Sequence, residues 1–314
     1  MTAADAIAPY YADVVRGPAA SATWLRTSDG VRIRLGIWPH PDAARGTVVI
    51  FPGRTEYIEK YAEVAGDLQA AGYSVAAIDW RGQGIADRLL KDRQIGHVAQ
   101  FTDYQHDVQA VMAALRARNM PKPWHLLAHS MGGAIGLRSL IDGQPFARAV
   151  FSAPMWGIQM SDALRPVAWA LSAVMPKVGL GNIFAPSTDK TPLVVSQPFA
   201  DNPLTTDAAQ YAAMTHQVET HPDLGLSGPS VQWLGTALRE MKLLSTRPSP
   251  SVPCTTLLGT NERIVDPEAI RTRMDRWRGG SLVMIEPGEH EVLMEAPTPR
   301  TAAIRATIDH LASV

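Results

Sequence analysis

The sequence predicts an α/β fold in which a mostly parallel sheet carries helices on both faces and receives an inserted helical cap. Short apolar runs alternate with helical periods over most of the 314 residues, as expected for strands that helices bury on both faces. The alternation stops between Ala153 and about Leu234, where the chain is helical in pattern, interrupted by proline and glycine, and rich in tryptophan and methionine. We therefore expect a core formed by residues 1–154 and 236–314, with the cap at residues 155–235.

Each element follows from a local pattern. Two apolar runs flank the turn at residues 28–30 and predict a β-hairpin. Counting this hairpin, we expect an eight-stranded sheet with strands at 24–27, 31–38, 47–51, 75–78, 125–128, 149–152, 255–259 and 281–285. Apolar residues at helical spacing predict helices at 59–70, 103–118, 135–141, 268–277 and 300–311.

Composition narrows the class of protein. Apolar residues make up 46% and charged residues 19% of the chain, which favours a globular core over disorder. The net charge of −1 argues against nucleic acid or an anionic membrane as an electrostatic partner. The single cysteine, Cys254, excludes an internal disulfide and a cysteine-rich metal site, and it suits a small core residue. We expect neither a metal nor a cofactor.

No targeting or membrane-spanning segment stands out. The first twenty residues lack a basic region followed by a long apolar run, so no signal peptide is expected. The longest apolar stretch, at residues 167–175, is too short to cross a bilayer. We expect a cytoplasmic protein, and the apolar cap leaves open a transient contact with a membrane surface.

One segment carries the clearest chemical signal. An apolar run ending at Ala128 leads through His129 to Ser130 and a glycine-rich helix start. This pattern predicts a nucleophile elbow, a sharp strand-to-helix turn that exposes a strained serine. Strand and helix pass close together there, and Ala128 and Gly132 are small enough to allow it. The alternative is an ordinary turn with an inert serine. The residues that could act together with Ser130 must distinguish these two interpretations.

A catalytic serine needs a histidine as its base. In folds of this kind the chain order is serine, acid, histidine. His290 lies in a turn-rich stretch after the apolar run 281–285, where a loop leaves the carboxyl end of a strand. His310 lies within a helical period and is expected at the surface. We therefore predict His290 as the base.

The acid should come from the loop that follows the strand ending at Gly259. Glu262 lies nearer the strand end than Asp266 does, so we favour Glu262. Asp266 directly precedes Pro267 and suits a helix N-cap. A loop carboxylate paired with Arg263 is the alternative for Glu262.

An oxyanion hole completes the predicted machinery. One donor should be the backbone N–H of Met131, the residue after the serine. The other should come from the loop at residues 52–56, which follows a buried strand. Gly53 permits an unusual backbone angle that would aim the Arg54 N–H inward. A simple strand–loop–helix connection is the alternative.

With these segments in order, the chain resembles α/β-hydrolases of the bacterial lysophospholipase and monoacylglycerol lipase branch, among the serine aminopeptidase S33-like hydrolases. The resemblance extends over about residues 47–300, so its joint specificity is high although each piece is weak. The matching segments are 51–63, like the oxyanion loop and first helix; 79–88, like D-x-R-G-x-G-x-S; 128–133, like G-H-S-M-G-G; 259–263, like G-x-x-D-R; and 290–295, like H-E-x-x-x-E.

Four positions depart from the family pattern and bear on the expected sub-branch, the elbow and the acid. Pro52 and Gln83 stand where many relatives have histidine, and both exchanges look like the lysophospholipase sub-branch. Ala128 replaces glycine in the elbow. Glu262 replaces aspartate and is one methylene longer, but it can still accept the Nδ1–H bond of His290 if the loop accommodates it.

The resemblance implies a serine esterase that cleaves an acyl ester of a single-chain lipid, a lysophospholipid or a monoacylglycerol, through an acyl-enzyme. A peptidase or iminopeptidase would need acidic cap residues, such as Asp201, Asp207 or Glu219, placed to bind a free amino terminus. A small-ester carboxylesterase and a non-catalytic binding module are further alternatives, although a binding module typically loses triad members.

The cap should set specificity. Its apolar residues, among which we predict Met155, Trp156 and Trp169 as substrate-binding, suit an acyl-chain tunnel. The alternative is that they pack the cap onto the core. Weak head-group selection is expected through Arg54, Arg81 or Arg88, near the loops that end the strands.

Overall fold

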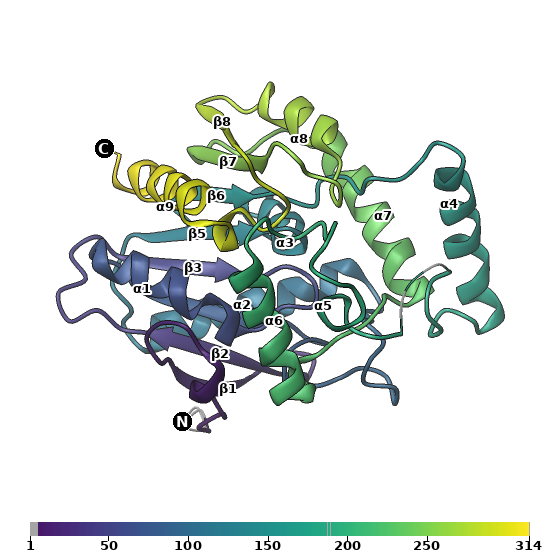
Figure 1. Cartoon of the computed structure of the whole chain (residues 1–314), viewed down its shortest axis with the longest axis horizontal. Coiled ribbons are helices and arrows are strands. Elements are labelled where there is room, and N and C mark those ends of the chain that lie inside the picture. The colour runs from purple at the N-terminus through teal and green to yellow at the C-terminus, as the bar shows by residue number, and fades with distance from the viewer. Residues whose placement is uncertain (1–5, 187, 189, 314) are drawn as a thin grey trace.

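A single eight-stranded sheet forms the centre of the molecule, and helices pack around it (Figure 1). The computed structural model describes residues 6–186, 188 and 190–313. The spatial order of the strands is β1-β2-β4-β3-β5-β6-β7-β8. The strands are β1 Ser21–Arg26, β2 Arg32–Trp38, β3 Thr47–Phe51, β4 Ser74–Asp79, β5 Trp124–His129, β6 Arg148–Ser152, β7 Cys254–Gly259 and β8 Gly280–Ile285.

The pairing confirms the predicted mostly parallel eight-stranded sheet. β1 pairs with β2, and β2 with β4, in the antiparallel sense. All remaining pairs, from β4–β3 to β7–β8, are parallel. The predicted hairpin is therefore confirmed, and β3 has its predicted bounds. Since parallel strands end at one edge, the loops after β3, β5, β7 and β8 gather at the same end of the sheet.

Helices of ordinary length fill the connections between strands. The α-helices are α1 Ala62–Ala70, α2 Tyr104–Ala117, α3 Met131–Ile141, α4 Leu164–Val174, α5 Leu193–Ser196, α6 Ala208–Thr220, α7 Val231–Thr246, α8 Pro267–Met274 and α9 Pro297–Ala312. Short 3-10 helices are η1 Ala12–Val14, η2 Ile58–Tyr61, η3 Phe101–Asp103, η4 Met175–Val178, η5 Pro222–Leu224 and η6 Val292–Met294. α3 begins at Met131, earlier than predicted, because the turn at Ser130 passes directly into the helix.

Two apolar cores lie on the two faces of the sheet. On β3, Val49 and Phe51 join the core that α2, α3 and α8 cover, whereas Val48 and Ile50 join the core under α1 and α9. This alternation is the two-residue period of a strand buried on both faces. In Figure 1, α1 and α9 lie in front of the sheet.

A long insertion, residues 153–253, leaves the sheet after β6 and returns at β7. It carries α4 to α7, and α4 packs on α7, which also contacts α3. The predicted boundary between residues 235 and 236 falls inside α7. Figure 1 shows α4 at the edge of the molecule, away from the sheet. Within the described ranges, no helix combines the length and apolar character needed to cross a bilayer.

A buried carboxylate ties together the loops at the end of β4. Asp79 accepts hydrogen bonds from the Arg34 Nε at 2.7 Å and from the amides of Ile58 and Ile85 at 2.9 and 3.0 Å. Arg34 also forms a bidentate pair with Glu59 at 2.8 and 2.7 Å. These charges are fully buried and mutually paired, so they fix the start of η2 directly after the loop at residues 52–56.

Candidate active site

The turn between β5 and α3 has the geometry of a nucleophile elbow. Ser130 has φ 49° and ψ −117°, a strained conformation for a residue with a side chain. A Cβ atom on Gly132 would lie 2.0 Å from the carbonyl oxygen of Phe51, so only glycine fits there. Ala128, which replaces the usual glycine, is accommodated because Gly136 presents no side chain to it. Ser130 is thereby held at the end of the sheet.

His290 and Glu262 come together across two loops. The His290 Nδ1 lies 2.8 Å from Glu262 Oε2, and both side chains are buried. The other carboxylate oxygen, Oε1, accepts the amides of Ile264 at 2.7 Å and Val265 at 3.0 Å. The loop thus curls around the longer glutamate side chain and fixes both of its oxygens.

The charge state of Glu262 follows from these contacts. Burial raises the pKa of its carboxyl, but the charge and hydrogen bond of His290 and the two loop amides outweigh burial. The net pKa of Glu262 therefore lies below the ordinary glutamate value. An ionised carboxylate bonded to Nδ1–H leaves the His290 Nε2 as the proton acceptor.

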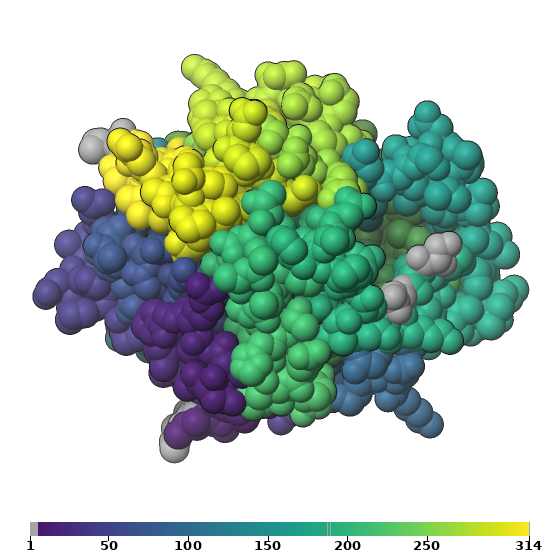
Figure 2. Space-filling model, viewed as in Figure 1, coloured from purple at the N-terminus to yellow at the C-terminus, as the bar shows by residue number. Residues whose placement is uncertain are grey.

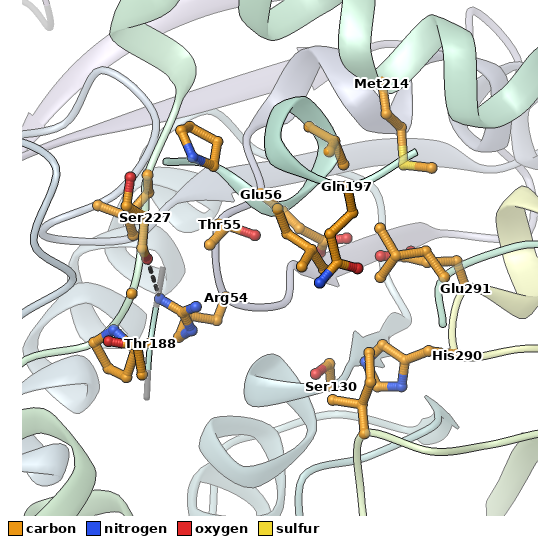
Figure 3. Close-up of a pocket in the computed structure, with 18 of the residues that line it drawn as sticks. Arg54, Thr55, Glu56, Ser130, Thr188, Gln197, Met214, Ser227, His290 and Glu291 are labelled. Carbon is orange, nitrogen blue, oxygen red and sulfur yellow. Dashed lines mark hydrogen bonds between the residues drawn. The ribbon is translucent and has the colours of Figure 1, made fainter. Parts of the chain in front are cut away.

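Ser130 and His290 line the same cavity (Figure 3). Among the described residues, no hydrogen bond joins the serine hydroxyl to the imidazole ring. Serine–histidine contacts are often long without substrate and shorten when it binds. The arrangement therefore brings the predicted nucleophile, base and acid to one place.

Side chains hold the loop at residues 52–56 in a defined shape. The Gln83 amide donates to the Gly53 carbonyl at 3.0 Å and accepts the Thr55 amide at 3.2 Å. Glu56 accepts the Gly53 amide. Within the part of the chain that the structure describes, these bonds leave the amides of Arg54 and Met131 without an acceptor. Two free amides beside a nucleophile suit an oxyanion hole.

The cavity has a volume of about 960 Å³ and a mixed lining. Figure 3 shows Arg54, Glu56, Ser130, His290 and Glu291 on its walls. Most of the remaining wall is apolar and comes from the insertion: Met155, Ile158, Leu193, Val194, Leu204, Met214, Val218, Leu226 and Leu234. Figure 2 shows the surface hollowed beside the segment that carries α4. The volume is ample for an acyl chain.

The structure corrects two of the three predicted substrate-binding residues. Met155 lines the cavity. Trp156 instead lies in the core, where it packs on Phe151 and Trp277 and donates to the Gly133 carbonyl at 3.2 Å. Trp169 packs against the core edge beneath Lys242 and does not line the cavity. Both tryptophans satisfy the packing alternative.

Sequence reasoning missed the residues that form most of the cavity wall. They lie between residues 188 and 234, in short segments that lack a clear apolar period. The helix α4, which carries several of the apolar cap residues, turns some of them outward, and Leu164, Val167 and Val174 are about half exposed or more. Only the way the insertion folds back over the sheet decides which segments line the cavity.

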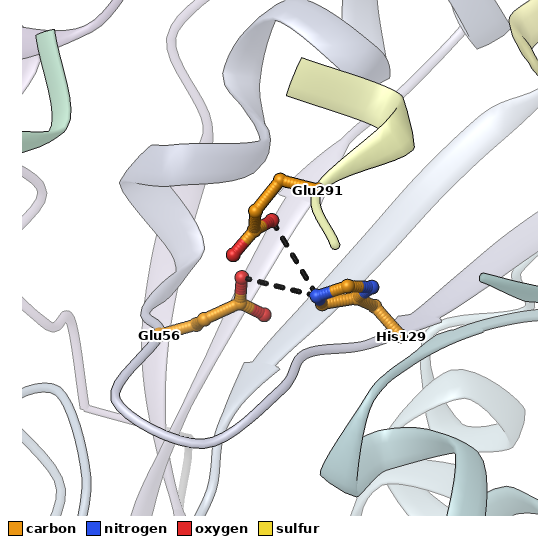
Figure 4. A group of neighbouring side chains, drawn as sticks. All are labelled: Glu56, His129 and Glu291. Atoms are coloured by element: carbon orange, nitrogen blue, oxygen red, sulfur yellow. Dashed lines mark ion pairs between the residues drawn. The ribbon is translucent and has the colours of Figure 1, made fainter. Parts of the chain in front are cut away.

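A second group of charges lies next to the predicted catalytic residues, and Figure 4 shows three of its members, Glu56, His129 and Glu291. Lys60 Nζ contacts Glu56 Oε1 at 2.5 Å and Glu291 Oε1 at 2.7 Å. The His129 Nε2 lies 3.4 Å from Glu291 and 3.9 Å from Glu56. Glu56 holds the loop at residues 52–56. His129 directly precedes Ser130 in the sequence, and Glu291 directly follows His290. The cluster therefore joins the three segments that carry the predicted oxyanion loop, nucleophile and base.

The contacts within this cluster shift the pKa values of Lys60, His129 and Glu291. Burial opposes the charge on Lys60, but Glu291 and Glu56 outweigh it, so the pKa of Lys60 is raised. The same balance of burial against the two carboxylates raises the pKa of His129. Burial raises the pKa of Glu291, yet Lys60 and His129 bring it well below the ordinary value. The cluster is thus an internally paired network of charges.

Three members of this cluster also have the spacing of metal ligands. Ligand atoms of Glu56, His129 and Glu291 lie within 4.8 Å of one another. The Lys60 ammonium contacts both carboxylates and supplies the positive charge that they need. A divalent cation would have to displace it against electrostatic repulsion. With Lys60 between their carboxylates, these residues do not fit a divalent metal ion.

Other candidate residues have structural roles. Asp266 caps α8 as predicted, accepting the amides of Glu268 and Ala269. His310 differs from the prediction: it is half-buried, and its ring contacts the Thr255 hydroxyl at 2.8 Å, because α9 packs across β7. Neither lies at the cavity.

The sheet order, the elbow and the inserted helices define an α/β-hydrolase. A family model described as serine aminopeptidase, S33 (Hydrolase_4) matches residues 42–297, so the chain belongs to this family.

Relatives and solved structures agree with this assignment. Lysophospholipase L2 of Escherichia coli (strain K12) is 33% identical over 279 residues, covering 83% of this chain and 79% of that protein. Monoacylglycerol lipase of Mycolicibacterium smegmatis is 29% identical over 178 residues, covering 55% and 61%. A soluble variant of the Saccharomyces cerevisiae monoglyceride lipase, solved with a substrate analog, shares the fold with a TM-score of 0.74 at 18% identity, covering 97% and 98%.

Proposed function

We propose that this protein is a carboxylic ester hydrolase that cleaves the acyl ester of a single-chain lipid, a lysophospholipid or a monoacylglycerol. Ser130 Oγ attacks the ester carbonyl while the His290 Nε2 takes its proton, and Glu262 stabilises the imidazolium. The amides of Arg54 and Met131 bind the developing oxyanion. His290 then protonates the leaving alcohol, and water repeats the sequence on the acyl-enzyme to release the fatty acid.

One observation carries the proposal. Ser130 and the buried His290–Glu262 pair open onto one cavity whose walls are mostly apolar. The region from 155 to 235 acts in this proposal as a cap that encloses the acyl chain. The relatives named as lysophospholipase and monoacylglycerol lipase support the same substrate class.

A peptidase is the alternative that the family description raises. Recognition of a free amino terminus requires a carboxylate that is not already paired with a cation. Asp201 pairs with Arg263 on the surface, and Asp207 caps α6. Glu56 and Glu291 do line the cavity, but Lys60 pairs with both. This charge balance favours the ester over the peptide substrate.

The outward apolar side of α4 suggests how a lipid substrate is reached. Leu164, Val167 and Val174 are exposed on that helix, beside exposed Val178 and Leu180. We propose that this surface touches a membrane transiently, in line with the amphiphilic substrate. The buried single thiol of Cys254 is compatible with a reducing compartment, and the cytoplasm is the location we propose.

An activity panel tests the proposed function. The substrates are a lysophosphatidylcholine, a monoacylglycerol of the same chain length, p-nitrophenyl butyrate and proline p-nitroanilide, with Ser130→Ala as the control. We expect the highest kcat/KM on a long-chain lipid ester and background rates with the control. A preference for butyrate would make the protein a small-ester carboxylesterase, and faster cleavage of the anilide would make it a peptidase.

A further inference from the structure

Three arginines near the strand ends are candidates for head-group selection, and the structure separates them. Arg81 is fully engaged, since it pairs with Asp107 at 2.8 Å and with Asp29 at 2.7 Å. The Arg88 guanidinium does not line the cavity. It donates hydrogen bonds to four backbone carbonyls, those of Gly82, Gly84, Asp223 and Gly225. Arg54 alone of the three lies in the cavity wall.

The Arg54 guanidinium has few hydrogen-bond and charge partners among the described residues. Its Nη1 donates to the Ser227 carbonyl at 2.7 Å, and the guanidinium lies 5.7 Å from the centre of the Trp233 ring. Among the described residues, no carboxylate forms an ion pair with it. A guanidinium has five N–H donors, and the described residues accept only the bond from Nη1, while Arg54 lines the cavity (Figure 3). Within the described part of the chain, a cation therefore lies in the cavity wall without a paired anion.

Among the described residues that line the cavity, no free carboxylate cancels this charge. The carboxylates of Glu56 and Glu291 are paired with Lys60 and His129. Lys190, from the insertion, lines the same cavity and adds a second positive charge. Burial lowers the pKa of Arg54 to about 10, so the guanidinium remains charged at neutral pH.

The position of Arg54 relative to the nucleophile is also informative. A Cβ atom built on the adjacent Gly53 would lie 3.1 Å from Ser130 Cβ, so this loop passes directly over the serine. In a lysophospholipid, the phosphodiester lies only a few bonds from the ester carbonyl. A substrate with its ester at Ser130 would therefore carry its anion close to the loop that bears Arg54.

We propose that the Arg54 side chain is the binding site for the phosphodiester of a lysophospholipid head group. The inference rests on the proposed function and deepens it, because a monoacylglycerol has no anion for this cation. Guanidinium and phosphate oxygens match in geometry and form charge-assisted, often bidentate, hydrogen bonds. The same residue then serves twice: its amide faces the oxyanion and its side chain faces the head group.

Substitution of the side chain separates these two roles because the amide stays in place. Arg54→Met removes the charge and keeps most of the length, and Arg54→Lys keeps the charge without the fork. Arg239→Met, at an exposed arginine on α7, is the matched control for the loss of one charge. The readout is the ratio of kcat/KM for a lysophosphatidylcholine to that for a monoacylglycerol with the same short acyl chain.

We expect Arg54→Met to lower this ratio about 10- to 100-fold, the range for loss of charge-assisted hydrogen bonds. Arg54→Lys should recover part of it, and Arg239→Met should leave it within about twofold. An equal effect of Arg54→Met on both substrates would overturn the inference while leaving ester hydrolysis intact. Failure of the unaltered protein to cleave either lipid would overturn the proposed function, and this inference with it.

Inhibition distinguishes a head group from free phosphate as the natural anion. Glycerol, sn-glycero-3-phosphocholine and inorganic phosphate are each added during monoacylglycerol hydrolysis. We expect the phosphodiester to inhibit competitively in the unaltered protein and at least tenfold more weakly in Arg54→Met. Inhibition by inorganic phosphate alone would contradict the head-group assignment and indicate a site for the free ion.

Discussion

Replacing Glu262 with glutamine alters the triad by one atom and leaves its shape unchanged. In the native loop, Oε1 accepts the amides of Ile264 and Val265, and Oε2 faces the His290 Nδ1 at 2.8 Å. A glutamine can keep its oxygen toward the two amides only by turning its NH₂ group toward Nδ1. The histidine is then forced to accept at Nδ1 and to carry its proton on Nε2, where it cannot serve Ser130.

The expected fall in kcat of Glu262→Gln can be estimated from these contacts. Flipping the glutamine would place its NH₂ group against two N–H donors and forfeit two hydrogen bonds, about 2 kcal/mol or roughly a 30-fold bias toward the wrong tautomer. Loss of the carboxylate also removes the charge that stabilises the imidazolium in the transition state. From the wrong tautomer and the lost charge together, we expect kcat to fall about 10²- to 10⁴-fold, with little change in KM.

The assay compares Glu262→Gln with Asp266→Asn, measuring kcat on a monoacylglycerol and the thermal midpoint of each variant. Asp266 caps α8 outside the cavity, so its variant should lose at most about 1 kcal/mol of stability and keep kcat within about threefold. The reasoning is refuted if Glu262→Gln keeps kcat within tenfold. It is equally refuted if Asp266→Asn is the more damaging change at unchanged stability.

Three further results are expected. Lys60→Met should remove the ammonium that pairs with the two buried carboxylates of Glu56 and Glu291, lowering the unfolding free energy in urea by about 3 kcal/mol, whereas Lys60→Arg should restore most of it. Burial lowers the pKa of His125 to about 4, so the unfolded chain binds more protons from there up to about 6.5; unfolding free energy should rise with pH in that window, and His125→Asn should flatten the rise. In a chain-length series of monoacylglycerols, kcat/KM should increase about fourfold per methylene until the cavity is full, and no increase would contradict acyl burial.

Local patterns were sufficient for the sheet and for the elbow. β3 was predicted at its observed bounds because its apolar run ends at Pro52 and Gly53. The pairing of Glu262 with His290 was also accessible, because both follow strands whose carboxyl ends must meet at one edge of the sheet. Chain order and parallel pairing together were therefore enough to place the expected triad residues near each other.

The cavity wall could not be predicted in the same way. Met155 and Trp156 are sequence neighbours, yet one faces the cavity and the other packs into the core, because the turn after β6 sends them in opposite directions. Lys60 and Glu291 meet although they lie 231 residues apart. Such contacts depend on how the insertion and the final loop fold onto the core, which no local period encodes.

The proposed mechanism requires Ser130 to be the nucleophile, which covalent labelling can establish. The protein is treated with an active-site fluorophosphonate and digested, and the labelled peptide is identified by mass spectrometry, with Ser130→Ala as the control. We predict stoichiometric label on Ser130, no label on the control, and labelling at least a hundredfold slower in Glu262→Gln. A label on another serine, or none on the folded protein, would contradict the account.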